Sequence, residues 1–300
     1  MLWIILATIS AILSAAAAIT QKKVLMRAHA LEFSFLVSFV LMILSFALPV
    51  TFDAAPFPHL PMMTLLLILG KSVIGGVAFL LVMMALERDQ ISSVLPLLGL
   101  TPAITALLAW GVLGETLSDW EWLGIGLMVV GTYLLERRPV KWRSLPSGER
   151  HVSPVLYYIG SALVLFALSS VADQMLIGGE KADPRVVLLY QHIVYCVMFG
   201  TLLAIRKAPL ASPLASVVQK GREQWPFLLA IAVLTIGYRF TQLEAVKYAP
   251  VALVLAVKRT SILYATLGGG KLFSDKHLGM KIAGALLIVA SGFIILRNVS

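Results

Sequence analysis

The sequence has 300 residues, of which 59% are hydrophobic and only 13% are charged, whereas an ordinary soluble domain has about 25% charged residues. This composition excludes an ordinary soluble globular protein. The net charge of +9 comes largely from basic residues in short segments between apolar runs, a distribution that encodes membrane topology and argues against nucleic-acid binding.

The apolar runs predict ten transmembrane helices, because each run approaches or exceeds the roughly 20 residues that span a bilayer. In chain order we expect helices at 2–19, 31–50, 62–86, 91–113 and 120–135, then at 154–177, 186–205, 225–246, 251–271 and 278–296. The first run has no basic residue ahead of it and no small-residue cleavage site, so it is interpreted as a retained helix. The expected fold is an all-α, polytopic membrane protein.

Loop charge predicts the orientation. The connections after the first, third, fifth, seventh and ninth helices, called the odd loops below, hold sixteen Lys and Arg residues. The other connections and the C-terminal tail hold four: Lys181, Arg185, Lys247 and Arg297. We therefore expect a multi-pass protein of the cell inner membrane with cytoplasmic odd loops and extracytoplasmic termini.

An internal repeat appears when Ala85 is laid over Ala245. ALERDQISSVLPLLGLTPAITALLAWGVLGE then aligns with AVKYAPVALVLAVKRTSILYATLGGGKLFSD, and Glu115 falls on Asp275. An odd number of helices per half makes the second half enter the membrane from the opposite side. The predicted organisation is a five-helix repeat at 1–138, a cytoplasmic linker at 139–153 and an inverted five-helix repeat at 154–300.

Four basic residues lie well inside predicted helices: Lys71, Arg239, Lys258 and Arg259. A central charge costs about 2.5 to 3.5 kcal/mol on insertion scales, so each needs a reason to be there. At a rise of about 1.5 Å per residue, these residues and His192 lie roughly 9 to 13 Å from helix ends that share one face. The sequence therefore places them at one depth in the membrane.

Glu244 and Asp173 lie toward the same face and are candidate charge partners or proton-coupling groups. Two acids cannot neutralise four cations, and the surplus predicts a site that an anionic ligand completes. Lys71 either belongs to this site or snorkels to the interface, and His192 is either a satisfied polar core residue or a proton-coupling group. Tyr238 and Tyr264 are further candidates for the cavity wall.

Chemistry other than transport has little support in the sequence. Cys196 is the single cysteine, so a disulfide or a CxxC pair is excluded. No P-loop, metal-ligand spacing or nucleophile motif is present. We expect no metal, no cofactor and no enzymatic activity.

The ten short-looped helices, the stretch PLLGLTPAITALLAWGVLGE ending at Glu115 and the string KYAPVALV resemble the EamA-type transporters of the drug/metabolite transporter superfamily. The resemblance implies a metabolite carrier with a central cavity between two halves that works by alternating access. VKRT at 257–260 is also similar to a Lys-Arg pair of the plastid sugar-phosphate translocators. That second resemblance implies phosphate binding by Lys258 and Arg259.

The sequence thus favours a secondary active transporter of a small organic anion, phosphorylated or carboxylated, with its basic site on the eighth and ninth helices. Its partners would be the lipid bilayer, the substrate and a coupling proton or counter-substrate, in an oligomeric state that the sequence leaves open. Alternatives are an exporter of amino acids or neutral metabolites, with the cluster as internal salt bridges, and a flippase for an anionic lipid head group.

Overall fold

The computed structural model describes residues 1–51, 60–89, 94, 97–114, 116–135, 143–144, 150–151, 154–178, 182–205, 214–262, 264, 286–287, 290–291 and 294. Its elements are α1 (Leu2–Leu25), α2 (Ala30–Thr51), α3 (Met62–Arg88), the 3-10 turn η1 (Leu98–Leu100), α5 (Thr101–Leu113), α6 (Asp119–Leu135), α7 (Pro154–Ile177), α8 (Pro184–Ile205), α9 (Leu214–Val246) and α10 (Val251–Lys258). Within these ranges the only strands are β1 (Arg143–Ser144) and β2 (Arg150–His151), an antiparallel pair with Arg143 opposite His151. The expected helical architecture is therefore observed.

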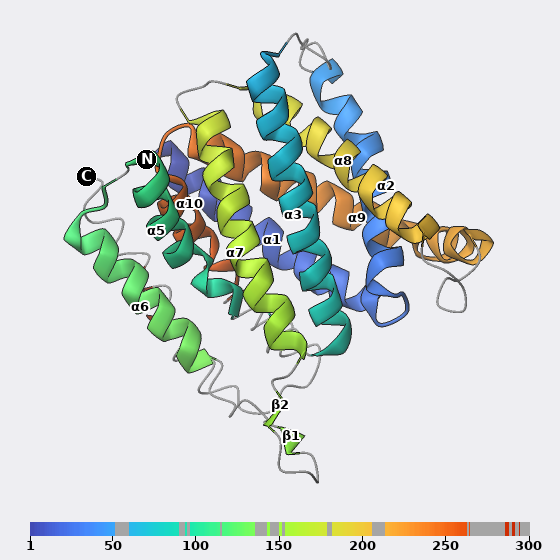
Figure 1. Ribbon diagram of the computed structural model, residues 1–300, viewed down its shortest axis with the longest axis horizontal. Helices are drawn as coiled ribbons and strands as arrows, with labels where there is room; N and C mark the ends of the chain where they lie inside the picture. The colour runs from blue at the N-terminus through green and yellow to red at the C-terminus, as the bar shows by residue number, and fades with distance from the viewer. Residues whose placement is uncertain are drawn as a thin grey trace.

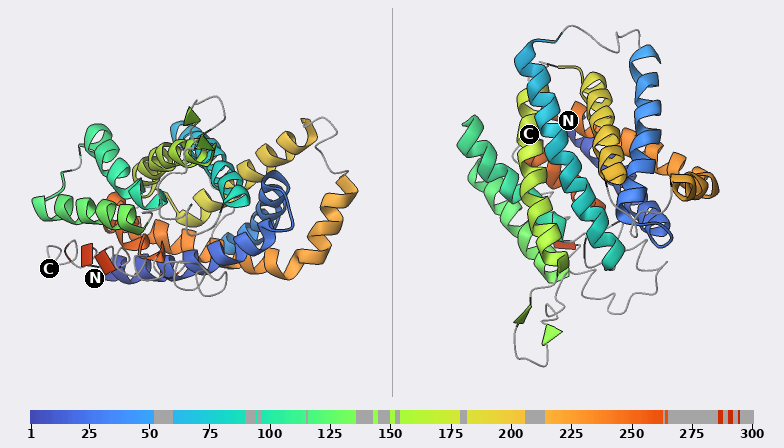
Figure 2. Two further views of the ribbon diagram at one scale, coloured as in Figure 1. Left: turned by 90° about the horizontal axis from the view of Figure 1, so that it is seen from below. Right: turned by 45° about the vertical axis from the view of Figure 1, so that its right-hand side comes forward.

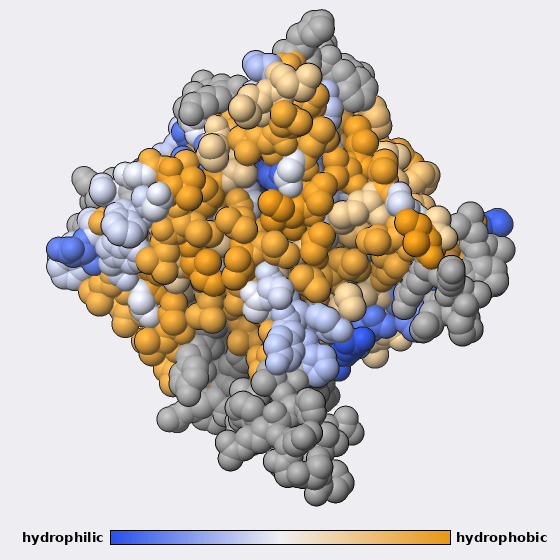
Figure 3. Space-filling model, in the orientation of Figure 1, coloured by the Kyte–Doolittle hydropathy of each residue, from blue (hydrophilic) through white to orange (hydrophobic). Residues whose placement is uncertain are grey.

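Six helices of the described chain are long and apolar enough to cross a membrane: Leu2–Leu25, Ala30–Ala47, Met62–Arg88, Pro154–Ile177, Pro184–Ile205 and Val217–Val246. Their outward faces carry large apolar side chains, for example Leu66 and Val233, which are 55% and 56% exposed. Figure 3 shows a broad band of hydrophobic side chains across one face of the molecule. A surface of this kind suits lipid rather than water.

The helices pack in two layers around a central space. In Figure 1, α3 and α7 lie side by side in front of α1, α9 and α10, and the view from below in Figure 2 separates the two layers. The main pairings are α1 with α9, α3 with α7, and α2 with α8. In addition, α2 contacts α9, α3 contacts α8, α5 contacts α7, α10 contacts α1, and α5 contacts α10.

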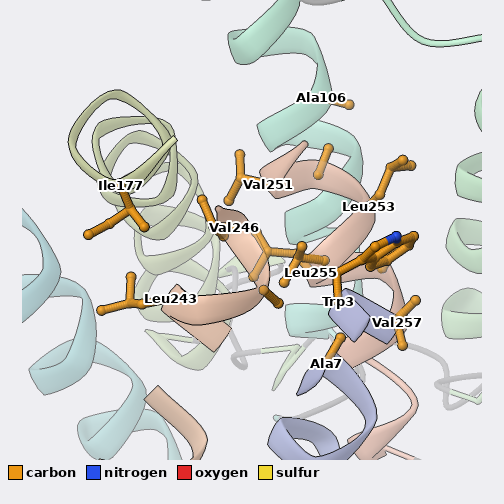
Figure 4. Packing of buried hydrophobic residues seen from close by; sticks show 14 of the residues in the cluster. Trp3, Ala7, Ala106, Ile177, Leu243, Val246, Val251, Leu253, Leu255 and Val257 are labelled. Carbon is orange, nitrogen blue, oxygen red and sulfur yellow. The ribbon is translucent and has the colours of Figure 1, made fainter. Parts of the chain in front are cut away.

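Buried apolar side chains pack together at the end of the bundle where α10 begins. Val251, Leu253 and Val257 of α10 lie against Trp3 of α1 and Ala106 of α5 (Figure 4). Every residue of α10 before Lys258 is buried. Because this helix is enclosed by apolar neighbours, its C-terminal end is held at a defined place in the protein interior.

Residues of the odd loops and the adjacent helix ends meet at one end of the bundle. The Nζ atom of Lys22 donates to the carbonyl oxygens of Leu86 and Asp89 at 2.5 and 2.8 Å. Lys220 binds Glu32 at 2.8 Å. These contacts join α1, the end of α3, α9 and the start of α2.

Several predicted helix boundaries are wrong. α1 continues to Leu25, beyond the predicted end at 19, because Lys22 is held by the carbonyls of α3 instead of entering a solvated loop. α9 begins at Leu214, so part of the predicted loop 206–224 is helical. The ninth predicted helix, 251–271, is interrupted: α10 runs to Lys258, a turn follows at 259–260, and positions 261, 262 and 264 are again helical, while 263 and 265–271 lie outside the described residues.

The fourth predicted helix, 91–113, is also less regular than expected: the 3-10 turn η1 precedes α5, which starts at Thr101 and Pro102. Proline is tolerated at the start of a helix, because the backbone N–H that it lacks would have no partner within the helix there. Of the tenth predicted helix, 278–296, the described positions 286, 287, 290, 291 and 294 are helical. The rest of that helix, Glu115 and Asp275 lie outside the described residues.

Candidate anion site in the central cavity

A cavity of about 160 Å³ lies between the two layers. Its wall combines residues of α1, α2, α3, η1, α5, α7, α8, α9 and α10. Five of the predicted site residues line it: His192, Tyr238, Arg239, Lys258 and Arg259. The cavity is thus the place where helices of both halves of the sequence meet.

Helical spacing brings the polar residues of each helix onto one face. Gln191, His192 and Tyr195 of α8 are separated by one and three positions, and Tyr238 and Gln242 of α9 by four, so each set faces the cavity together. Polar residues in membrane helices are expected to face the protein interior in this way.

Asp173 is the acid at the centre of the first contact network. Its side chain is 1% exposed and accepts hydrogen bonds from Lys71 Nζ and, at 3.2 Å, from Arg239 Nη2. Gln191 Oε1 accepts from the same two donors at 2.9 and 3.1 Å. Lys71 is 2% exposed, so it does not snorkel to the surface.

Gln242 extends this network to Lys258. Its Oε1 atom accepts from Arg239 Nη1 at 3.2 Å and from Lys258 Nζ at 2.5 Å. The Lys258 ammonium also lies 4.5 Å from the centre of the Tyr238 ring, a cation–π contact. The partners of Lys258 in the described structure are therefore a neutral amide and an aromatic face.

Arg259 sits just beyond the end of α10 and reaches toward α5. Its Nη2 atom donates to Thr101 Oγ1 at 2.8 Å. The Nε atoms of Arg259 and Arg239 are buried and have no hydrogen-bond partner among the described atoms. Two guanidinium groups in the cavity wall thus retain an unused donor.

His192 has a hydroxyl partner inside the protein. Its Nδ1 atom lies 2.6 Å from Ser45 Oγ, and its ring meets Tyr195 edge-on at 6.3 Å between ring centres. The side chain is 1% exposed. Its geometry is that of a satisfied polar core residue that also borders the cavity.

Two predicted residues stand apart from this network. Glu244 pairs with Lys247 at 2.9 Å, three positions along the chain, and not with a cavity cation. Tyr264 is 42% exposed and does not line the cavity. Within the described ranges, no group of three His, Cys, Asp or Glu side chains is arranged to hold a metal ion.

Two contacts of the candidate site were missed by sequence reasoning: Thr101 with Arg259 and Ser45 with His192. Both join residues far apart in the sequence through uncharged hydroxyls, which no motif marks. For Thr101 a signal exists, because the repeat alignment places it opposite Ser261, which also lines the cavity.

Comparison with known proteins gives the family context. Residues 1–137 match the EamA-like transporter family. Solute carrier family 35 member G1 from Homo sapiens is 24% identical over 228 residues, and the same protein from Mus musculus is 24% identical over 235 residues. Each match covers 74% of this chain and spans 59% of the length of the mammalian protein.

The fold also matches a solved crystal structure over 97% of this chain and 96% of the other, with a TM-score of 0.72 and 15% sequence identity. That likeness concerns the fold alone. Together with the family match over residues 1–137, the six apolar helices identify a multi-pass helical protein that resembles membrane transporters. More particularly, residues 1–137 carry an EamA-like transporter domain, which confirms the resemblance seen in the sequence.

Proposed function

We propose that this protein is a secondary active transporter of a small organic anion, which binds at Arg239, Lys258 and Arg259. The observation that carries the proposal is the charge balance of the cavity. Four basic side chains surround or contact it, and within the described residues Asp173 is the single carboxylate that pairs with them. An anionic ligand would complete this balance.

The energetic cost of burying unpaired charges supports this interpretation. Removing a charge from water is expensive unless an opposite charge and hydrogen bonds replace the water. Lys71 and Arg239 share Asp173, but Lys258 and Arg259 contact only neutral groups among the described residues. A substrate carboxylate or phosphate would supply both the missing charge and acceptors for the free Nε donors.

The guanidinium groups favour planar or tetrahedral oxyanions. An Arg side chain presents a fork of donors that matches carboxylate and phosphate oxygens, whereas Lys acts as a point charge. The combination of Arg239, Lys258 and Arg259 therefore suits a phosphorylated or carboxylated metabolite, as the similarity of VKRT to the sugar-phosphate translocators implied.

Alternating access between two inverted five-helix repeats, 1–138 and 154–300 with the linker 139–153, is part of the proposal. Exchange of the halves relates the observed pairings: α1 with α9 corresponds to α7 with α3, and α2 with α9 to α8 with α3. The alignment of Ala85 with Ala245 also lays η1 over 258–260, where α10 ends. Broken helices at equivalent places are a known construction of transporter binding sites.

Orientation follows the loop charges. We propose that the odd loops face the cytoplasm and that both termini lie outside the inner membrane. The grouping of Lys22, Lys220 and the end of α3 at one end of the bundle supports a single basic face.

Counterflow in proteoliposomes tests the function. Vesicles that contain the purified protein are loaded with unlabelled phosphorylated or carboxylated metabolites, and uptake of the labelled compound is measured. Lys258→Gln and Arg259→Gln should each abolish most of the uptake. Lys247→Gln is the matched control, because this lysine lies outside the cavity in a pair with Glu244, and its uptake should be unchanged.

Uptake that persists in both cavity variants would overturn the anion site and would favour a carrier of neutral metabolites with an internally paired cluster. Translocation of labelled anionic lipid without flux of soluble anions would instead identify a flippase.

A further inference from the structure

We infer that the transported anion is amphipathic, with an apolar body attached to its charged group, and that it is not a polyhydroxylated compound such as a sugar phosphate. This inference rests on the proposed anion site. It comes from the way in which polar and apolar side chains are distributed along the depth of the cavity.

The basic groups occupy one end of the cavity. Lys71 and Arg239 each donate to Asp173, and Gln242 accepts from both Arg239 and Lys258. The charged group of a ligand would bind here, because this end supplies the unpaired donors.

The cavity then extends toward the odd-loop end between large apolar side chains. Phe79 follows Lys71 by eight residues on α3, which corresponds to roughly 12 Å along the helix. On the antiparallel neighbour α7, Phe166 precedes Asp173 by seven residues, roughly 10 Å in the same direction. Both phenylalanines line the cavity, at about the same depth relative to the Lys71–Asp173 pair.

The same wall continues beyond the phenylalanines. Met83 and Leu86 lie further along α3, at roughly 18 and 22 Å from the level of Lys71. Leu41 of α2 lines the cavity one turn from Ser45, the partner of His192, on the side nearer the odd-loop end. The cavity wall on α2 and α3 is therefore apolar toward the odd-loop end, while Ser169 and Ser170 of α7 lie between Phe166 and the charged end.

The opposite wall, on α1, consists mostly of small residues. Ala15 and Ala18 line it, with Ser14 and Gln21 as its polar members. The small side chains of α1 leave space for the body of a ligand. The large apolar side chains on the opposite wall would contact that body.

The energetic consequence favours an apolar body. A ring or hydrocarbon chain placed beside Phe79 and Phe166 leaves water for an apolar surface, which is favourable. A body that carries several hydroxyl groups would lose hydrogen bonds to water there without gaining enough partners. The site would thus discriminate between ligands both by the charged group and by the polarity of the body attached to it.

Pairs of ligands with the same head group test the inference. Phenyl phosphate is compared with glucose 6-phosphate, and benzoate with gluconate. Binding is measured by thermal stabilisation of the full-length protein. Phenyl phosphate should bind about tenfold or more tightly than glucose 6-phosphate, the change expected for burial of part of one aromatic ring, and benzoate should likewise exceed gluconate.

Variants separate the two ends of the site. Lys258→Gln should weaken both phosphates. Phe79→Ala and Phe166→Ala should weaken phenyl phosphate and leave glucose 6-phosphate nearly unchanged. Phe39→Ala is the control, because Phe39 is 45% exposed on α2 and lies outside the cavity wall. The unliganded melting temperature of each variant confirms that it is folded.

Equal or tighter binding of glucose 6-phosphate, lost in Lys258→Gln, would overturn the amphipathic substrate but keep the anion site. If neither phosphate nor either carboxylate bound, the anion site itself would be wrong, and the inference would fail with it.

Discussion

Arg259 and Thr101 join two places in the described chain where helical geometry is interrupted next to the cavity. Arg259 follows the last residue of α10, and Thr101 opens α5 directly after the 3-10 turn η1. Their hydrogen bond, 2.8 Å between Nη2 and Oγ1, links the two halves of the sequence across the cavity wall. A charged donor thus fixes the relative position of two irregular helix ends.

Replacing this hydroxyl should measure the strength of that link. Thr101→Val keeps the side-chain shape and removes both the acceptor for Arg259 and the donor to the Leu98 carbonyl oxygen, 2.6 Å away, so it should lower stability by about 0.5 to 2 kcal/mol. Thermal unfolding in detergent provides the measurement. Thr105→Val is the control, since Thr105 Oγ1 is buried without a partner and its loss should cost nothing. Equal effects of the two variants would contradict a specific role for the Arg259 contact.

Asp173→Asn should strongly destabilise the protein. The change leaves Lys71 and Arg239 without their shared carboxylate, and breaking a buried ion pair from one side costs about 3 to 5 kcal/mol. Glu244→Gln, which affects only the partly exposed pair with Lys247, should change the melting temperature far less. The double variant Lys71→Met with Asp173→Asn should recover part of the loss. An unchanged melting temperature for Asp173→Asn would show that this pair contributes no net stability.

Gln242→Glu should separate stability from binding. Gln242 Oε1 already contacts both Arg239 and Lys258, so an isosteric carboxylate would neutralise part of the surplus charge. We expect a higher melting temperature without ligand and at least about tenfold weaker anion binding, because a nearby fixed charge competes with the ligand. A variant that binds anions as tightly as the parent would argue against ligand binding beside Gln242.

Glycines on α3 should tolerate alanine unequally. A Cβ atom on Gly76 would lie 2.5 Å from Met198 Cε and 3.1 Å from Tyr195 Cδ1, while one on Gly70 would meet nothing within 4 Å. Gly76→Ala should therefore cost about 1 to 3 kcal/mol through overpacking. Gly70→Ala should be neutral or stabilising by up to about 1 kcal/mol, because alanine favours helix. The melting temperatures of the two variants test this difference. An unchanged melting temperature for Gly76→Ala would mean that α8 moves away from α3 at little energetic cost.

Much of the fold could be predicted from apolar run length alone, because in lipid the backbone of a spanning segment must satisfy its own hydrogen bonds. The boundaries failed where long-range contacts replace solvent. Lys22 has the composition of a loop residue, but carbonyl groups 64 and 67 positions away keep it in α1. Such contacts depend on packing between helices, which periodicity does not encode.

The common depth of the basic cluster was predictable, but the pairing of its side chains was not. Counting residues from helix ends placed Lys71, Arg239 and Lys258 at one level, and the structure joins them in one network. The same counting could not distinguish Asp173 from Glu244 as the partner, because rotation about the helix axis decides which acid faces the cavity. The pairing of Glu244 with Lys247, at three positions' separation, was a local pattern that the sequence did contain.

In the carrier proposed above, the charge surplus of the cavity would couple transport to membrane voltage. Four cations and one carboxylate leave three formal positive charges among the described residues at the site, and a dianionic ligand would reduce these to one. Each elementary charge that crosses the full potential is worth about 2.3 kcal/mol per 100 mV. With the odd loops in the cytoplasm, as proposed, a negative cell interior would hold the empty site facing inward more strongly than the filled one. The resting voltage would then favour loading from the cytoplasm.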